Sequence, residues 1–382
     1  MKVKHLPGLD GLRFISITFV VLHHLFTFKT NFGFNSFDYP VLGLIGLYGI
    51  HFFFMGSGFL ITYLLLFEFA ENGRINLKYF FLRRILRIWP AYYLLIITAL
   101  LLLLKTPFFR IPGITDNYLN ADFQKSNLLY FCFMPHLQPF FFPTAPYIHQ
   151  TYTIGIEEQF YLLWGLMFYF FRKWMYSIFI VLLFAGPLLN ILHYLISETY
   201  KTSSPPFYLS YVKSGITYLQ YSRFSTFAIG SLVGYAYFQQ KNWVGIFKNG
   251  FVQVLVYAVL VVSIALRLSI PFFQNEYMAG IMACVMLIGV FKKDSFINYS
   301  ANWLSHLGKI SYGIYLFHMI AIVLAAKAAV VIFSSETGFN VTIFLILTTL
   351  VISITFGYLS YYCFETYFLK LKSFFRNIRP AH

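Results

Sequence analysis

Charged residues are scarce in this sequence: they make up 11% of its 382 residues, against roughly 25% in soluble domains. Hydrophobic residues account for 59% and aromatic residues for 22%. A water-soluble chain of this length has no core large enough to bury so much apolar surface. The scarcity of charge therefore excludes an ordinary soluble globular protein and indicates a polytopic protein that lies in a lipid bilayer.

Residues that bind metals are also few or badly spaced. The chain has only three cysteines, and these are too far apart to form a metal-ligand motif. Its ten histidines show no H-x3-H spacing of the kind that binds zinc. We therefore expect no metal cofactor.

The net charge of +15 does not indicate nucleic acid, because the basic residues form no basic domain that would bind a phosphate backbone. We also expect that the chain opens with no short cleavable leader. Its first apolar segment carries Arg13 and the pair His23–His24, which a signal peptide does not need. We expect this segment to stay attached as a membrane anchor.

What the sequence does contain is a series of long apolar segments. Each approaches the roughly 20 residues that cross about 30 Å of hydrocarbon. The pattern predicts an all-α membrane bundle of about ten transmembrane helices, forming one domain over residues 1–382 with no separate soluble domain. The spans are predicted near 12–31, 42–67, 88–105, 153–171, 174–196, 223–240, 251–268, 276–291, 309–333 and 342–366.

The lysines and arginines predict the orientation of these spans. If the N-terminus is cytoplasmic, most of the basic residues fall in segments on the cytoplasmic side, namely 1–5, 74–87, 172–173, 241–248, 292–293 and 370–379. The positive-inside rule then supports ten spans with cytoplasmic N- and C-termini. Two external connections are long, near 106–152 and 197–222. The first is rich in proline and aromatic residues, so we expect it to pack on, or dip into, the outer face.

Charged and polar residues inside the spans require a reason, because burial in lipid costs several kcal/mol. Arg13 and His24 are eleven residues apart. Eleven helical steps return to within roughly 20° of the start and separate the two residues by roughly 16 Å along the axis. One face of the first helix thus carries a cation near the cytoplasm and an imidazole deep in the membrane. A snorkelling arginine and a packed histidine are the structural alternative.

A basic cluster begins the third span. Arg83, Arg84 and Arg87 would anchor a helix on the cytoplasmic side. Guanidinium groups also bind phosphates through paired hydrogen bonds. The spacing alone does not choose between these roles.

Acidic residues begin the fourth span. Glu157 and Glu158 are adjacent, so they point to different helix faces; one is expected to cap the helix start while the other faces inward. Further inward candidates are His51, Ser57, Arg223, His318 and Glu365. For most of these a structural hydrogen bond is the simpler explanation, and Ser57 lies in a Gly-Ser-Gly run that is typical of close helix packing.

In this order the segments resemble the acyltransferase 3 family of integral membrane acyltransferases. The resemblance covers about residues 5–370, and it depends on six motifs in sequence. They are Leu9–Arg13 with His24, Gly49–Thr62, Phe81–Pro90, Glu157–Trp164, Arg223–Gly230 and Leu307–His318. Two positions depart from the family pattern: His51 stands where Asp is frequent, and Tyr152 where Trp precedes the two glutamates.

The resemblance implies a multi-pass enzyme of the bacterial inner (plasma) membrane that O-acylates cell-envelope polysaccharides or other hydroxyl-bearing acceptors. It implies acetyl-CoA as the acyl donor, with Arg13, Arg83, Arg84 and Arg87 binding its phosphates. His24 would act as a general base or accept the acyl group itself, and Glu157 would orient the acceptor. Because some relatives carry a fused extracellular domain, we expect this chain to act either alone or with a separate extracytoplasmic partner.

A transporter or flippase of a sugar or lipid-linked substrate is the alternative from another class. Intramembrane Arg, His and Glu residues that face a polar cavity would serve substrate passage equally well. Transporters often have two halves with matching hydropathy, and this sequence shows no such pairing. The residues leave open the acceptor, the length of the acyl chain, the direct or covalent route and the oligomeric state.

Overall fold

A computed structural model describes residues 6–34, 40–120, 123–202, 207–291, 294–333 and 338–375. Within these ranges all regular secondary structure is helical and no strand occurs. The predicted all-α class is therefore confirmed. The basic residues at 1–5, 292–293 and 376–379, which contributed to the predicted orientation, lie outside the described residues.

Each of the ten predicted spans contains a helix. The long helices are α1 (Pro7–Phe28), α2 (Pro40–Asn72), α3 (Leu77–Thr98), α7 (Tyr152–Phe171), α8 (Met175–Thr202), α14 (Ser311–Phe333) and α15 (Phe339–Leu359). Those of intermediate length are α9 (Phe207–Tyr221), α10 (Phe224–Phe238), α11 (Gly250–Ala265) and α12 (Gln274–Val290).

Short helices fill the connections and the helix ends. The α-helical ones are α4 (Thr115–Leu119), α5 (Phe123–Phe131), α6 (Gln138–Phe141), α13 (Asn302–Lys309) and α16 (Thr366–Leu371). The 3-10 turns are η1 (Lys29–Phe32), η3 (Pro107–Phe109), η4 (Pro135–Leu137), η5 (His149–Thr151), η6 (Arg172–Trp174), η7 (Asn242–Lys248) and η9 (Lys372–Phe375). Two π-helical turns, η2 (Ala99–Leu103) and η8 (Ser360–Glu365), extend α3 and α15.

The number of helices that can cross a membrane is smaller than the number of predicted spans. Among the described residues, six continuous helical segments are long and apolar enough, or seven if the bent pair η7 and α11 forms one span. One segment, His149–Tyr200, contains both α7 and α8. The helices α10, α11 and α12 have 15, 16 and 17 residues, which gives only about 22–26 Å at 1.5 Å per residue. The count of ten therefore stays a prediction.

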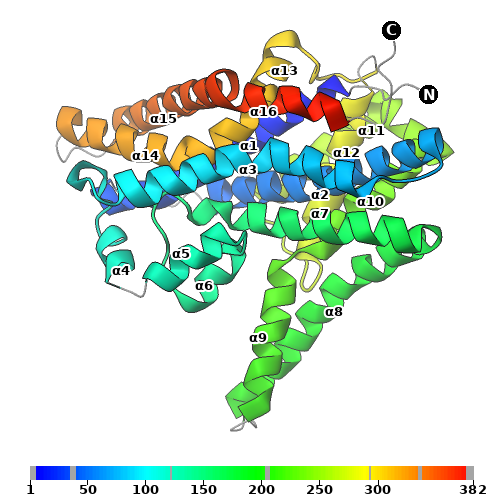
Figure 1. The fold of residues 1–382 in the computed structure, drawn as a ribbon, viewed down its shortest axis with the longest axis horizontal. Helices are drawn as coiled ribbons and strands as arrows, with labels where there is room; N and C mark the ends of the chain where they lie inside the picture. The colour runs from blue at the N-terminus through cyan, green and yellow to red at the C-terminus, as the bar shows by residue number, and fades with distance from the viewer. Residues whose placement is uncertain are drawn as a thin grey trace.

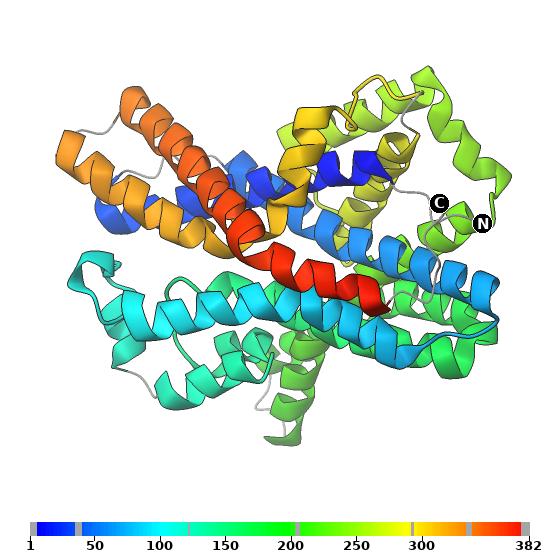
Figure 2. The same ribbon diagram turned by 45° about the horizontal axis from the view of Figure 1, so that its top comes forward.

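The long helices α1, α2, α3, α7, α14 and α15 run roughly along one axis (Figures 1 and 2). The start of α1 and the helix α16 lie toward the same end of this bundle in both views. The side of the membrane that this end faces stays a prediction. For brevity we name it the α1-start end.

The helix α2 crosses α10 at very short range because both helices carry glycine at the crossing. A Cβ atom at Gly58 would lie 2.1 Å from the carbonyl oxygen of Phe227, and one at Gly230 would lie 1.8 Å from that of Met55. No side chain fits at such distances. The close packing predicted from the Gly-Ser-Gly run is confirmed for Gly58, whereas a Cβ at Gly56 would meet only a ring atom of Phe52, at 3.9 Å.

The two long connections that were predicted to be external differ. The segment near 106–152 folds into short turns that pack on the bundle, where Tyr92 and Tyr93 of α3 donate hydrogen bonds to the carbonyls of Tyr130 and Phe131. The connection predicted over 197–222 is instead mostly helical. The helix α8 continues to Thr202, and α9 then extends with it away from the bundle as a hairpin (Figure 1).

Candidate functional site

A cavity of about 100 Å³ lies in the bundle between α1, α2, α3, α7 and α14. Five of the residues proposed from the sequence line it, namely Arg13, Ser57, Arg84, Arg87 and Glu157. Their side chains come from four helices, and 144 positions separate the first from the last. The fold thus concentrates basic, hydroxyl and acidic groups at one place in an otherwise apolar interior.

Glu157 has two hydrogen-bond donors in this cavity. Ser57 donates its hydroxyl to Oε1 at 2.8 Å, and Tyr161 donates to Oε2 at 3.2 Å. Since α7 begins at Tyr152, Glu157 and Glu158 lie in the second turn, so the expectation that one of them caps the helix is wrong. Glu158 points elsewhere and accepts a hydrogen bond from the Trp89 indole at 3.4 Å.

Three guanidinium groups line the same cavity. Arg13 is paired with Asp10 of its own helix at 3.1 Å. Arg84 is only 8% exposed, its guanidinium lies 5.4 Å from the Tyr161 ring, and its Nε has no hydrogen-bond partner in the described part of the chain. Arg87 follows one turn later. A buried guanidinium with an unused donor, beside two further guanidinium groups, forms a site where an anion would be bound strongly.

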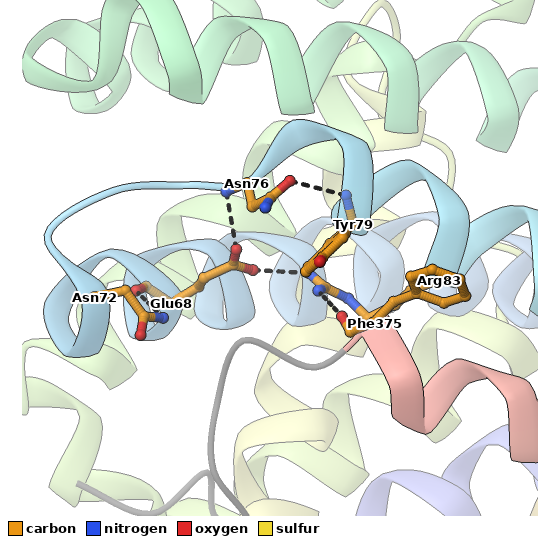
Figure 3. A network of polar contacts seen from close by, with 6 residues as sticks. All are labelled: Glu68, Asn72, Asn76, Tyr79, Arg83 and Phe375. Carbon is orange, nitrogen blue, oxygen red and sulfur yellow. Dashed lines mark hydrogen bonds and ion pairs between the residues drawn. The ribbon is translucent and has the colours of Figure 1, made fainter.

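Arg83 does not line the cavity, and its side chain is directed toward Glu68 and Phe375 (Figure 3). It donates to Glu68 at 2.7 Å, in an ion pair, and to the carbonyl oxygen of Phe375 at 2.8 Å. Glu68 also accepts from the backbone of Asn76, at the start of α3. The ring of Phe375 packs edge-on against Tyr79. In this structure Arg83 therefore joins the end of α2, the start of α3 and the segment after α16.

His24 does not line the cavity but forms a pair with His318 of α14. The Nδ1 atom of His24 lies 2.9 Å from Nε2 of His318, and Nδ1 of His318 lies 2.6 Å from the backbone oxygen of Tyr315. A carbonyl only accepts, so in the neutral pair Nδ1 of His318 donates to it and Nε2 of His318 accepts from His24. The lone pair on Nε2 of His24 is then left for chemistry, and within the described ranges no hydrogen bond occupies that atom.

Two further residues, not singled out from the sequence, complete this region. His149 of η5 lies edge-on against His24, with ring centroids 5.4 Å apart. Tyr315 lines the cavity and also lies beside His318, at a centroid distance of 5.9 Å. Tyr315 therefore links the cavity to the histidine pair. Its place in the motif Leu307–His318, three residues before His318, is the sequence signal that could have identified it.

The remaining residues proposed from the sequence make contacts outside the cavity. His51 is bonded through Nε2 to Arg223 at 2.9 Å, and Arg223 also donates to Asn275 at 2.9 Å. Glu365 accepts a hydrogen bond from Ser360 at 2.6 Å inside the π-helical turn η8. None of these three candidates lines the cavity. In the described ranges no group of three or more His, Cys, Asp or Glu side chains is arranged to hold a metal ion.

Comparison with known proteins supports one family. Peptidoglycan O-acetyltransferase OatA of Listeria monocytogenes is 31% identical over 176 residues, which is 45% of this chain and 25% of that protein. The "Putative peptidoglycan O-acetyltransferase YrhL" of Bacillus subtilis is 24% identical over 342 residues, 84% of this chain and 49% of its own length. The matches thus cover half or less of these relatives. No solved structure matches the chain.

A family match covers nearly the whole chain. Residues 6–359 match the family model described as an acyltransferase domain. This range begins one residue before α1 and ends with the last residue of α15. It therefore includes every residue that lines the cavity and the histidine pair. The chain belongs to the acyltransferase 3 family.

Proposed function

We propose that this protein is a membrane O-acyltransferase that moves an acetyl group from acetyl-CoA to a hydroxyl of a cell-envelope carbohydrate. The observation that carries the proposal is the cavity lined by Arg13, Arg84, Arg87 and Glu157, next to a histidine pair whose tautomers leave Nε2 of His24 as a base. The relatives named as peptidoglycan O-acetyltransferases favour a glycan acceptor.

The donor would approach from the side that carries the arginines. Coenzyme A presents phosphates, and guanidinium groups bind phosphates through paired, charge-assisted hydrogen bonds. Arg84 supports this role most directly, since it is buried and its Nε is unpartnered within the described residues. Arg83 was expected to join this group, but its contacts with Glu68 and Phe375 support a structural role instead.

The acyl thioester of the bound donor would then reach His24, in the direction of the α1 axis. Arg13 and His24 are eleven residues apart on one helix, a rise of roughly 16 Å, which the extended arm of coenzyme A would bridge. Nε2 of His24 would take the proton of the acceptor hydroxyl as its oxygen attacks the thioester carbonyl. The carbon–sulfur bond breaks and coenzyme A leaves as the thiolate. In the covalent route Nε2 attacks first and passes the acyl group on.

The acceptor side is assigned to Glu157, which Ser57 and Tyr161 hold in place. A fixed carboxylate can accept hydrogen bonds from sugar hydroxyls and so bind and orient them. The proposal includes ten spans with both termini in the cytoplasm, a place in the bacterial inner membrane and a separate extracytoplasmic partner.

The test uses purified protein in nanodiscs with radiolabelled acetyl-CoA and a peptidoglycan fragment as acceptor. We expect His24→Ala to reduce release of coenzyme A and transfer of label by at least 100-fold while the donor still binds. His23→Ala is the matched control, because it removes the neighbouring imidazole, for which no side-chain hydrogen bond is found in the described region. It should retain most of the activity.

Two outcomes would contradict the proposal. Equal activity of wild type and His24→Ala would remove His24 from the chemistry. Absence of any binding of acetyl-CoA to the wild-type protein would favour the transporter or flippase instead, since a passage lined by Arg, His and Glu requires no acyl donor.

A further inference from the structure

A second and larger cavity, of about 510 Å³, lies further along α2 than the site described above. Its walls are the end of α2, the end of α10, η7 and the residue after α12. Aromatic rings dominate the lining, among them Tyr63, Phe67, Tyr237 and Phe291. The volume falls in the range of small-molecule sites, about 300–1,000 Å³. No residue of the catalytic proposal lines it.

The polar part of this lining is basic. Lys241 and Lys248 stand at its edge, with Gln240 and Asn242 as uncharged neighbours. The ammonium group of Lys248 lies 5.0 Å from the centroid of the Phe291 ring, a cation–π distance. In the described part of the chain no carboxylate forms an ion pair with either lysine. The cavity therefore has two positive charges that can bind an anionic ligand.

The backbone around the two lysines is fixed by buried hydrogen bonds. Gln253 is fully buried, and its amide donates to the carbonyls of Phe247 at 3.0 Å and Asp294 at 2.6 Å. It also accepts from the backbone of Phe296 at 3.0 Å. Asn249 caps α11 by accepting from the first amides of that helix. The segment η7 thus has a defined position and is not a loose loop.

The segment η7 also has the character of a membrane-surface element. It is bent by 80° from α11, so it lies nearly across the direction of that apolar helix. Trp243, Ile246 and Phe251 are 46%, 50% and 77% exposed. Tryptophan and lysine together are typical of the boundary between hydrocarbon and water. The cavity therefore opens where lipid headgroups lie.

The cavity belongs to the α1-start end of the bundle. Phe291 directly follows α12, whose Gly289 lies against Gly8 in the first turn of α1, as a Cβ at Gly8 would come within 1.9 Å of its carbonyl oxygen. On the predicted topology this is the cytoplasmic side, where anionic lipids create a negative surface. The charge of the cavity is complementary to that surface.

We propose that this cavity binds the headgroup of an anionic phospholipid, with Lys241 and Lys248 on the phosphate and the aromatic walls around the glycerol backbone. Basic pockets between transmembrane helices bind anionic headgroups in this way. The exposed Trp243, Ile246 and Phe251 then lie along the acyl chains. The proposal does not depend on the acyl-transfer chemistry.

The test is native mass spectrometry of the detergent-solubilised protein with phosphatidylglycerol or with phosphatidylcholine of the same acyl chains. We expect wild type to retain phosphatidylglycerol preferentially. At roughly 1 kcal/mol for each lysine, Lys241→Gln and Lys248→Gln should each weaken retention about fivefold and the double variant about 30-fold. The control is Lys78→Gln with Lys173→Gln, which removes the same charge from two exposed lysines outside the cavity and should leave retention unchanged.

Three results would overturn the assignment. Unchanged retention in the Lys241→Gln/Lys248→Gln protein would exclude the cavity, provided that its melting temperature matches that of wild type. An equal loss in the Lys78/Lys173 control would mean that general surface charge binds the lipid. Inorganic phosphate that displaces phosphatidylglycerol from wild type at equal ionic strength would identify a free phosphate, not a lipid, as the ligand.

Discussion

Replacing Ser57 by alanine tests the acceptor side of the proposed site. Its hydroxyl donates to Glu157 at 2.8 Å and lies 3.2 Å from the hydroxyl of Tyr161. Alanine keeps the helix and removes one oxygen atom, so Glu157 loses one of its two hydrogen-bond donors. A hydrogen bond to a charged group contributes about 1.5–3 kcal/mol. If that energy holds the carboxylate in its reactive position, kcat/KM for acetyl transfer falls about 10- to 150-fold.

The assay is transfer of labelled acetyl from acetyl-CoA to a peptidoglycan fragment, with donor and acceptor concentrations varied separately. The loss should appear in the acceptor kinetics, while binding of acetyl-CoA stays within about twofold of wild type. Ser311→Ala is the control, because Ser311 lines the same cavity but its hydroxyl donates to the carbonyl of Gly308. The reasoning is refuted if Ser57→Ala and Ser311→Ala have the same kcat/KM as wild type.

Arg84→Gln should raise the KM for acetyl-CoA at least tenfold, because it removes the buried guanidinium proposed to bind the donor's phosphates, whereas Arg83→Gln should leave that KM near wild type; equal values in the two variants would contradict the assignment. Gly230→Ala should lower the free energy of unfolding by about 1–3 kcal/mol, since its Cβ has no room at the crossing with α2, while Gly280→Ala, where a Cβ meets nothing within 4 Å, should not; thermal melting in detergent measures both. Burial lowers the pKa of His136, in the connection predicted to be external, to about 4 from 6.5. The unfolded chain therefore binds more protons between these values, and stability on the order of 3 kcal/mol is present above pH 6.5 and lost as the pH falls toward 4. In His136→Gln the melting temperature should change less between pH 6.5 and pH 4 than in wild type. An unchanged pH dependence of the melting temperature would exclude His136 as its origin.

The amino-acid sequence by itself determined the class of this protein. Hydrophobic runs in a chain with 11% charged residues require lipid, and a backbone in lipid must satisfy its own hydrogen bonds, so helices follow. Each predicted span contains a helix for this reason. Arg13 and His24 could be placed on one face because they share a helix, where a fixed rotation per residue relates their directions.

Local patterns failed where neighbouring elements decide the outcome. Arg83 and Arg84 are adjacent basic residues of one cluster, yet Arg84 lines the cavity and Arg83 pairs with Glu68. The sequence cannot separate them, because the partners come from other helices. The capping expectation for the two glutamates was wrong for a related reason: η5 leads into α7 before residue 153, so the helix starts earlier than the apolar run indicates.

Only the tertiary structure decided which distant groups meet. Ser57 and Glu157 are 100 residues apart and share a hydrogen bond, and His24 and His318 pair across 294 residues. Helix packing brings them together, and that packing depends on close crossings such as the one at Gly58. Such contacts have no local period that a sequence pattern could reveal. The sequence thus identified the residue types available for chemistry, and the packing of the helices determined their partners.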